Sequence, residues 1–333
     1  MKPVVWGVLS DSTHYRLRVH ANLRTSPIVE LRAIASRSQE KAAAAAREFG
    51  MPKAYGSYEQ LLADREIEAV YIPLPNAMHA EWVKKAAAAG KHILCEKPFA
   101  MDAPEAEKAI RYAEGKGVLV MEAFMYRYHP QWKRAREILA TGEIGQVHSI
   151  HTLFTYMLKD PTNIRNILEA GGGAISDIGC YAVSSARFLL GKEPERAISL
   201  VHRDPALKTD ILSSGILDFG TVRSVFTVAT QTHPSQRVDV IGSGGELTIH
   251  LPFNAYPDVP LQVTVSTGIG TRNIFAPVSD QYVEMFEAFS RAVRGGGPVP
   301  TPPQDAIANM KVLDALFRSE KSGTWEKVTE VLG

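Results

Sequence analysis

Lys97 is a candidate catalytic residue because of its position in the sequence. Lys97 directly follows an apolar run within HILCEKP, residues 92–98, at the carboxyl edge where ligands bind in open α/β sheets. Pro98 restricts the backbone of Lys97 to an extended conformation, which determines where the amine points. A partly desolvated lysine at such a corner can serve the oxygen of a reacting carbon. The competing interpretation is an ordinary surface lysine.

A second pair of reactive side chains, Asp177 and Tyr181, lies four residues apart in a stretch expected to be helical, from about 175 to 190. Residues at this spacing share a helix face, so both can point into one cleft. The triple glycine at 171–173 precedes them and lets the backbone approach a ligand without a β-carbon in the way. The alternatives are a flexible loop and, for Tyr181, a ring packed into the helix's apolar stripe.

A possible phosphate-binding loop, GVLSDS at residues 7–12, follows the first apolar run. A dinucleotide fold places the pyrophosphate at this point, on backbone N–H groups at a helix N-terminus. Small residues permit close approach, but Asp11 puts negative charge beside the phosphates. The expected cofactor contacts are Gly7, Leu9, Ser10 and Ser12. The loop alone is equally consistent with an ordinary turn.

The second apolar run ends in Ser36-Arg37-Ser38, with no acidic residue where a ribose 2′-hydroxyl would be held. An arginine flanked by hydroxyls suits a 2′-phosphate, because the guanidinium offers a fixed fork of donors. These residues favour NADP, with NAD still possible, over the alternative of a solvated arginine at a strand end.

The first third of the chain predicts a Rossmann, doubly wound parallel sheet, because short apolar runs alternate with alanine-rich helical stretches. Strands are expected at 4–9, 30–35, 69–72, 92–95 and 119–122, and helices at 39–49, 57–63, 80–89 and 104–116.

After about residue 123 the pattern changes to consecutive strands, which predicts an α+β domain with a large, mostly antiparallel open sheet. Strands are expected at 147–156, 197–201, 213–218, 223–230, 237–241, 246–250 and 261–266, and further helices at 130–140, 281–293 and 303–318. The α/β chain is therefore predicted to have a dinucleotide-binding domain at 1–123 and a substrate-binding and oligomerisation domain at 124–333.

Composition excludes several classes. Lys+Arg 37 against Asp+Glu 36 leaves almost no net field to attract nucleic acid, and no apolar run predicts a signal peptide or membrane span. A cytoplasmic location is expected. Cys95 and Cys180 are far apart and in no CxxC pair, so neither a disulfide framework nor a metal site is expected.

Four stretches, taken together, resemble the glucose-fructose oxidoreductase/inositol dehydrogenase/rhizopine catabolism (Gfo/Idh/MocA) family. They are VYIPLPN at 70–76 with His79; GKH at 90–92 running into EKP at 96–98; MEAFMYRYHP at 121–130; and GGGA at 171–174 leading to DIGCY at 177–181. The third is similar to the branch of NADP-dependent xylose dehydrogenases and dimeric dihydrodiol dehydrogenases. The resemblance covers most of the chain, in order.

The resemblance implies roles for individual residues. Lys97 matches the catalytic lysine, whose bond to proline is frequently cis; Asp177 matches a carboxylate that holds a substrate hydroxyl; and Tyr181 matches an acid/base residue. Leu74, Asn76, His79 and Glu96 match positions that cradle the nicotinamide half, and Asn163 and Arg165 match the substrate-lining segment. Relatives usually have a neutral residue at position 11 and an apolar one at 14, so Asp11 and His14 depart from the family pattern.

The implied activity is hydride transfer between nicotinamide and a carbinol or carbonyl carbon of a sugar, polyol or diol, such as an aldose or a trans-dihydrodiol. The alternatives are a catalytically silent dinucleotide-binding sensor of the same fold and an α/β protein without cofactor. The open face of the C-terminal sheet is expected to pair subunits into a homodimer or homotetramer, because alternating apolar residues such as Val225 lie on it.

Overall fold

Six parallel strands form the first sheet of the chain, seen here in a computed structural model that describes residues 1–295 and 297–328. The strand order is β3-β2-β1-β4-β5-β6, so the direction of winding reverses between β1 and β4. The strands are β1 (Val4–Leu9), β2 (Val29–Ala35), β3 (Lys53–Tyr55), β4 (Ala69–Ile72), β5 (His92–Cys95) and β6 (Val120–Glu122). Every residue of β1, β4 and β6 is buried, as expected for a parallel sheet covered on both faces.

The helices of this sheet begin and end where the sequence provides caps. Ser38 Oγ accepts a hydrogen bond from Lys41 N at the start of α2 (Gln39–Phe49), and Gly50, in the left-handed region, ends it. Ser57 and Asp102 cap α3 (Tyr58–Ala63) and α5 (Ala103–Gly115) in the same way. The remaining helical segments are η1 (Tyr15–Val19), α1 (His20–Leu23), η2 (Asn76–Met78) and α4 (His79–Ala88). The predicted Rossmann sheet is confirmed, although the short β3 was missed.

The chain divides into a first unit, residues 1–125 with 282–307, and a second unit, residues 126–281 with the chain from 308 onward. The expected boundary at 123 lies close to the observed one, but helix α8 (Gln281–Val293) belongs almost entirely to the first unit. Its Phe286 ring lies 4.7 Å from Trp6 and 5.1 Å from Tyr71. Packing between residues more than 200 positions apart leaves no local signal in the sequence.

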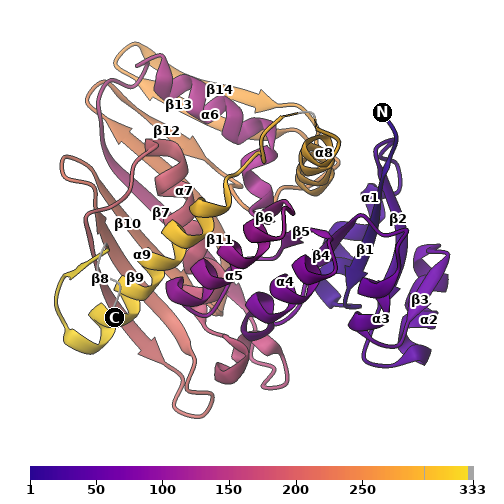
Figure 1. The fold of residues 1–333 in the computed structure, drawn as a ribbon. Helices are drawn as coiled ribbons and strands as arrows, with labels where there is room; N and C mark the ends of the chain where they lie inside the picture. The colour runs from indigo at the N-terminus through magenta and orange to yellow at the C-terminus, as the bar shows by residue number, and fades with distance from the viewer. Residues whose placement is uncertain (296, 329–333) are drawn as a thin grey trace. The chain divides into compact units, whose positions relative to one another are not determined.

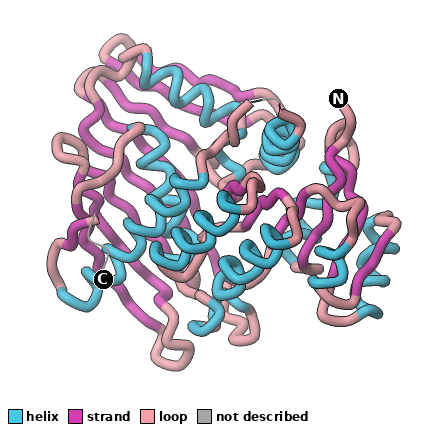
Figure 2. Tube along the Cα trace, in the orientation of Figure 1, coloured by secondary structure: helices cyan, strands magenta, loops and turns pink. Residues whose placement is uncertain are grey.

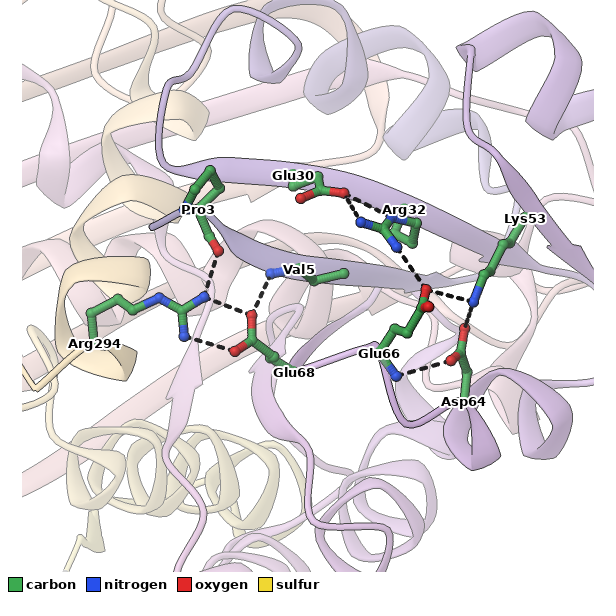
Figure 3. Close-up of polar contacts among 9 residues, drawn as sticks. All are labelled: Pro3, Val5, Glu30, Arg32, Lys53, Asp64, Glu66, Glu68 and Arg294. Carbon is green, nitrogen blue, oxygen red and sulfur yellow. Dashed lines mark hydrogen bonds and ion pairs between the residues drawn. The ribbon is translucent and has the colours of Figure 1, made fainter. Parts of the chain in front are cut away.

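The amino ends of the first unit's strands carry a set of paired charges (Figure 3). Arg294 donates to both oxygens of Glu68, at 2.8 and 2.6 Å, and Glu68 also accepts from Val5 N. Nearby, Glu66 joins Arg32 and Lys53. These contacts tie α8 and the starts of the strands together.

Nine strands form the second sheet, in the order β14-β13-β12-β11-β7-β10-β9-β8-β15. They are β7 (Val147–Met157), β8 (Arg196–Arg203), β9 (Asp210–Asp218), β10 (Arg223–Ala229), β11 (Gln231–Gly242), β12 (Gly245–Ile249), β13 (Leu261–Thr267), β14 (Gly270–Ala276) and β15 (Glu326–Lys327). Among these strands only β7 and β10 pair in parallel. The mostly antiparallel sheet is therefore confirmed; β14 and β15, at its two edges, were missed.

Helices of the second unit lie on one face of this sheet (Figures 1 and 2). They are α6 (Pro130–Ala140), α7 (Cys180–Leu190) and α9 (Pro303–Ser322); the short segments are η3 (Met125–Tyr128), η4 (Ile164–Asn166), η5 (Leu168–Ala170) and η6 (Ile175–Gly179). None of the described helices combines the length and apolar character needed to cross a membrane.

The other face of the sheet exposes large apolar side chains. The strand register puts Leu153, Thr227, Ser214 and Leu200 in one row across β7, β10, β9 and β8. Leu200 is 80% exposed, and Leu212 and Val225 in adjacent rows are also exposed. We call this set, Leu153, Leu200, Leu212 and Val225, the apolar face.

Candidate active site

Lys97 follows β5 at the carboxyl edge of the first sheet, beside the β1/β4 reversal where ligands bind in such folds. The Lys97-Pro98 bond is cis. The side chain of Lys97 is half-buried, while the residues on both sides of it are buried. Lys97 therefore lies where the sequence predicted it, at a corner directly after a buried strand, at the carboxyl edge of the sheet.

Glu96 is a buried carboxylate that holds this corner. Its Oε1 accepts a 2.6 Å hydrogen bond from the Tyr71 hydroxyl, and its Oε2 accepts one from Lys97 N at 3.2 Å. The Nε2 of His14 lies 3.5 Å from Oε1. Burial alone would raise the pKa of Glu96, but His14, Lys97 and Tyr71 outweigh it and hold the pKa at about 2. The unusual His14 thus lies beside a fixed negative charge.

His79 is fully buried at the start of α4. Its Nδ1 lies 2.8 Å from the carbonyl oxygen of Pro98, and its Nε2 lies 2.8 Å from that of Leu74. The ring therefore joins the chain after β4 to the chain after β5. Asn76 opens η2 between them.

In the loop after β1, a serine takes a backbone conformation that is usual for glycine. Ser10 has φ 141°, a value that residues other than glycine rarely adopt. Burial raises the pKa of Tyr58, and the nearby Ser10 side chain opposes this. The Ser12 hydroxyl accepts from Tyr15 N at the start of η1. Leu9 is buried in β1, and a Cβ on Gly7 would lie 2.6 Å from the Leu61 side chain, so Gly7 allows α3 to pack closely.

Asp11 forms an ion pair within the first unit. Its Oδ1 accepts a 2.6 Å hydrogen bond from Arg16, which also pairs with Glu48. This pairing draws Asp11 toward η1 and reduces its repulsion of a phosphate.

Arg37 is exposed after β2, and no ion pair joins it to any residue within 1–295 or 297–328. Ser36 and Ser38 flank it; Ser36 N donates to Tyr55 O, and Ser38 is the α2 cap. The exposed Arg37 guanidinium, just before helix α2, therefore fits the 2′-phosphate of NADP.

In the second unit, Asp177 forms a three-residue cluster with Tyr156 and Arg165. Its Oδ2 accepts from the Tyr156 hydroxyl at 2.7 Å and from Arg165 Nε at 3.0 Å. The pKa of Arg165 is raised, chiefly by Asp177, and burial followed by Asp177 raises that of Tyr156. Asn163 uses its side-chain oxygen to cap Arg165 N. Tyr156 belongs to no recognisable motif and was not expected at the site; it points inward from β7 in the strand's alternating pattern.

Tyr181 lies in the first turn of α7 and packs in an aromatic cluster. Its ring centroid lies 5.1 Å from Phe253 and 5.6 Å from Phe154. The side chain is 5% exposed. The ring therefore packs among apolar side chains, as the alternative interpretation expected.

The triple glycine, residues 171–173, allows close packing of its backbone against neighbouring segments of the second unit. A Cβ on Gly173, whose φ is 123°, would lie 2.0 Å from Asp210 Oδ1, and one on Gly172 would meet the Arg165 carbonyl. Asp210 is buried, and its Oδ2 accepts from Ile175 N and from the Ser213 hydroxyl. It thereby anchors the start of η6, which carries Asp177. The sequence analysis did not single out Asp210, because its partner is 35 residues away.

The structure thus gathers Lys97, Glu96, Leu74 and His79 in the first unit and Asp177, Arg165 and Asn163 in the second. Within the described parts of the chain, no cluster of three or more histidine, cysteine or acidic side chains could hold a metal ion.

Comparisons with known proteins match both halves. The model of an oxidoreductase family with an NAD-binding Rossmann fold matches residues 7–124, and the GFO/IDH/MocA C-terminal domain matches residues 132–248. The chain is 40% identical to the D-xylose 1-dehydrogenase (NADP(+)) 2 of Haloferax volcanii, covering 88% of this chain and 90% of that protein. It is 33% identical to a trans-1,2-dihydrobenzene-1,2-diol dehydrogenase of Mus musculus over 64% of each chain. The 3-ketoreductase KijD10 of Actinomadura kijaniata, solved with NADP and TDP-benzene, superposes with a TM-score of 0.90 at 29% identity, covering 96% of this chain and 98% of that one.

Proposed function

Because the chain belongs to the Gfo/Idh/MocA oxidoreductase family, we propose that it is an NADP-dependent enzyme acting on a sugar, polyol or diol. It transfers a hydride between nicotinamide and a carbinol or carbonyl carbon. The observation that carries this proposal is the Lys97 corner, fixed by Glu96 on one side and by the His79 contacts on the other.

The proposed cofactor site runs along the carboxyl edge of the first sheet. NADP, when bound, supplies or accepts the hydride. The residues proposed to hold it are Gly7, Leu9, Ser10, Ser12, Ser36, Arg37, Ser38, Leu74, Asn76, Glu96 and Lys97. The buried His79 is proposed to act indirectly, through its contacts with the Leu74 and Pro98 carbonyls. Arg37 selects NADP because its guanidinium has no ion pair with a described residue and can bind a 2′-phosphate.

The proposed chemistry needs three side chains. The Lys97 ammonium orients the substrate oxygen and stabilises negative charge that develops on it. The Tyr181 hydroxyl gives or takes the proton of that oxygen. Asp177 accepts a hydrogen bond from a substrate hydroxyl, with Arg165 and Tyr156 fixing its orientation and Asn163 fixing the Arg165 backbone.

Two observations favour an enzyme over a silent dinucleotide sensor. Lys97, Asp177 and Tyr181 are all present, and the Asp11 charge that disfavours phosphate binding is paired with Arg16. Relatives with 30% identity or more include a D-xylose dehydrogenase, a dTDP-sugar 3-reductase and a dihydrodiol dehydrogenase, so sugars and diols are both candidate substrates.

A substrate panel tests the proposal. Aldoses, polyols and trans-dihydrodiols are each assayed with NADP⁺ and with NAD⁺, and NADPH binding is followed by nicotinamide fluorescence. Turnover with NADP⁺ on at least one class is expected. Binding of NADPH with no turnover on any class would favour the sensor, and absence of nucleotide binding would reject both.

We also propose that the apolar face pairs two subunits. Its residues lie on adjacent strands, and an exposed patch of this kind is unfavourable in water. Leu200→Glu places a charge at its most exposed leucine and is expected to reduce the mass measured by light scattering to that of smaller species. The control is Leu17→Glu in the first unit, 71% exposed, which should leave the mass unchanged. A wild-type monomer would contradict the pairing.

A further inference from the structure

His79 has two hydrogen-bond partners that can only accept. The carbonyl oxygens of Pro98 and Leu74 lie 2.8 Å from Nδ1 and Nε2 respectively, and neither oxygen carries a proton. The side chain is fully buried, so water cannot take the place of either partner.

A neutral imidazole has one N–H, so in that state one ring nitrogen would present its lone pair to a carbonyl oxygen at 2.8 Å. An imidazolium has two N–H groups and satisfies both oxygens. Short contacts on both sides are therefore the geometry of the doubly protonated ring.

The charged groups around His79 act in opposite directions. The pKa of His79 is lowered overall, mainly by burial; the two carbonyl bonds and the Glu96 carboxylate oppose burial, and Lys97 adds to it. Glu96 stays ionised because Tyr71, His14 and Lys97 stabilise its negative charge, so it provides a permanent countercharge.

We propose that His79 is an imidazolium that ties the Leu74 and Pro98 carbonyls together and so positions Lys97. Its two hydrogen bonds join the loops after β4 and β5, neighbouring strands on one side of the β1/β4 reversal. His79 is thus a positioning residue that contacts the backbone next to Lys97, and its catalytic consequence rests on the oxidoreductase activity proposed above.

Two other buried histidines are internal controls. His20 is hydrogen-bonded through Nε2 to a single carbonyl, that of Phe49, and needs only one N–H. His129 accepts from Gln131 N through Nδ1, so that nitrogen cannot be protonated. Both are expected to be neutral, which for His129 agrees with a pKa lowered to about 4, mainly by burial.

The test is nitrogen-15 NMR of the full-length protein labelled at histidine, near neutral pH. His79 should show two protonated ring nitrogens, whereas His20 and His129 should each show one. The His79 signals are assigned by their loss in His79→Gln or, if that variant does not fold, by contacts of the ring N–H protons with Leu74 and Pro98. One unprotonated ring nitrogen in His79 overturns the proposal.

Kinetics test the positioning role. Glutamine cannot donate to both carbonyls, so His79→Gln is expected to lower kcat at least about tenfold while the Kd for NADPH changes less than about twofold. His20→Gln, the control, should leave kcat unchanged. An unchanged kcat in a folded His79→Gln refutes the positioning role. Failure of the wild type to turn over any substrate would reject the proposed function but leave the NMR result standing.

Discussion

The two edges of the parallel sheet in the first unit use charged side chains in different ways. At the amino edge, Arg294, Arg32 and Lys53 each pair with one or two acidic residues (Figure 3). At the carboxyl edge, Glu96 collects several donors, and Arg37 has no ion pair with a described residue. The cations named at the amino edge are paired within the protein, whereas Arg37 at the carboxyl edge is exposed and is proposed to bind a ligand.

This difference shows how one sheet separates folding from chemistry. Loops at the carboxyl ends of parallel strands converge at the reversal of strand order, so groups there can act on one ligand. Groups at the amino ends have no such role and contribute to holding strands and α8 together. Paired substitutions at the two edges should therefore change different measurements.

The largest expected difference is between two lysines. Lys97→Met should lower kcat about 10²- to 10⁴-fold, because the substrate oxygen loses its cation, with NADPH affinity nearly intact. Lys53→Met at the amino edge should leave kcat unchanged and lower the free energy of unfolding only slightly, because its ion pairs lie at the surface. Steady-state kinetics and denaturant unfolding check both. Comparable activity in the two variants would remove the role of Lys97.

Two arginines should separate cofactor affinity from stability. Arg37→Ala is expected to weaken NADPH binding by about 1.5–3 kcal/mol and NADH binding far less, because a charged hydrogen bond to the 2′-phosphate is lost. Arg294→Ala should leave both affinities unchanged and lower the free energy of unfolding by about 1–3 kcal/mol, because Glu68 loses its bidentate partner. Fluorescence titration and urea unfolding measure the two effects. Equal loss of NADPH and NADH affinity would contradict the role of Arg37.

Two serines in the loop after β1 should respond with opposite signs. Ser10→Gly is expected to stabilise the fold by about 1 kcal/mol, because the strain of φ 141° outweighs the lost Tyr58 contact. Ser12→Ala should destabilise it by about 1 kcal/mol, because Tyr15 N loses its cap. Thermal unfolding compares them. A less stable Ser10→Gly variant would mean that the loop conformation is not strained.

The smallest expected effect is a pH dependence at the amino edge. Burial alone would raise the pKa of Asp64, but Lys53, Glu66 N and Tyr55 lower it from 3.8 to about 2. Asp64 therefore contributes stability that is complete above about pH 4 and lost as the pH falls toward 2. Unfolding free energies measured across this range should fall less steeply in Lys53→Met than in the wild type. Identical slopes would show that Lys53 does not set the pKa of Asp64.

Much of the architecture could be predicted from local patterns. The limits of β1, β4, β5, α2 and α6 follow directly from apolar runs, caps and glycines. The missed strands are β3, which is short, and β14 and β15, which lie at sheet edges and carry little apolar signal. The polar first half of β11 was missed for the same reason.

The candidate residues could be named from the sequence because each is part of a short motif, as with Lys97 in Glu-Lys-Pro. The hydrogen-bond partners of these residues could not be named from the sequence. The hydrogen bonds of Glu96 with Tyr71, of Asp177 with Tyr156 and of Ile175 with Asp210 span 25, 21 and 35 residues.

The amino-acid sequence by itself determined which elements form and which side chains are chemically suited, because helix caps, strand periodicity and motif spacing act over a few residues. Only the tertiary structure decided that α8 joins the first unit, that Arg16 pairs with both Asp11 and Glu48, and that His79 meets two carbonyl oxygens. These outcomes depend on burial and on distances between groups far apart in the chain, and the folded backbone alone sets those distances.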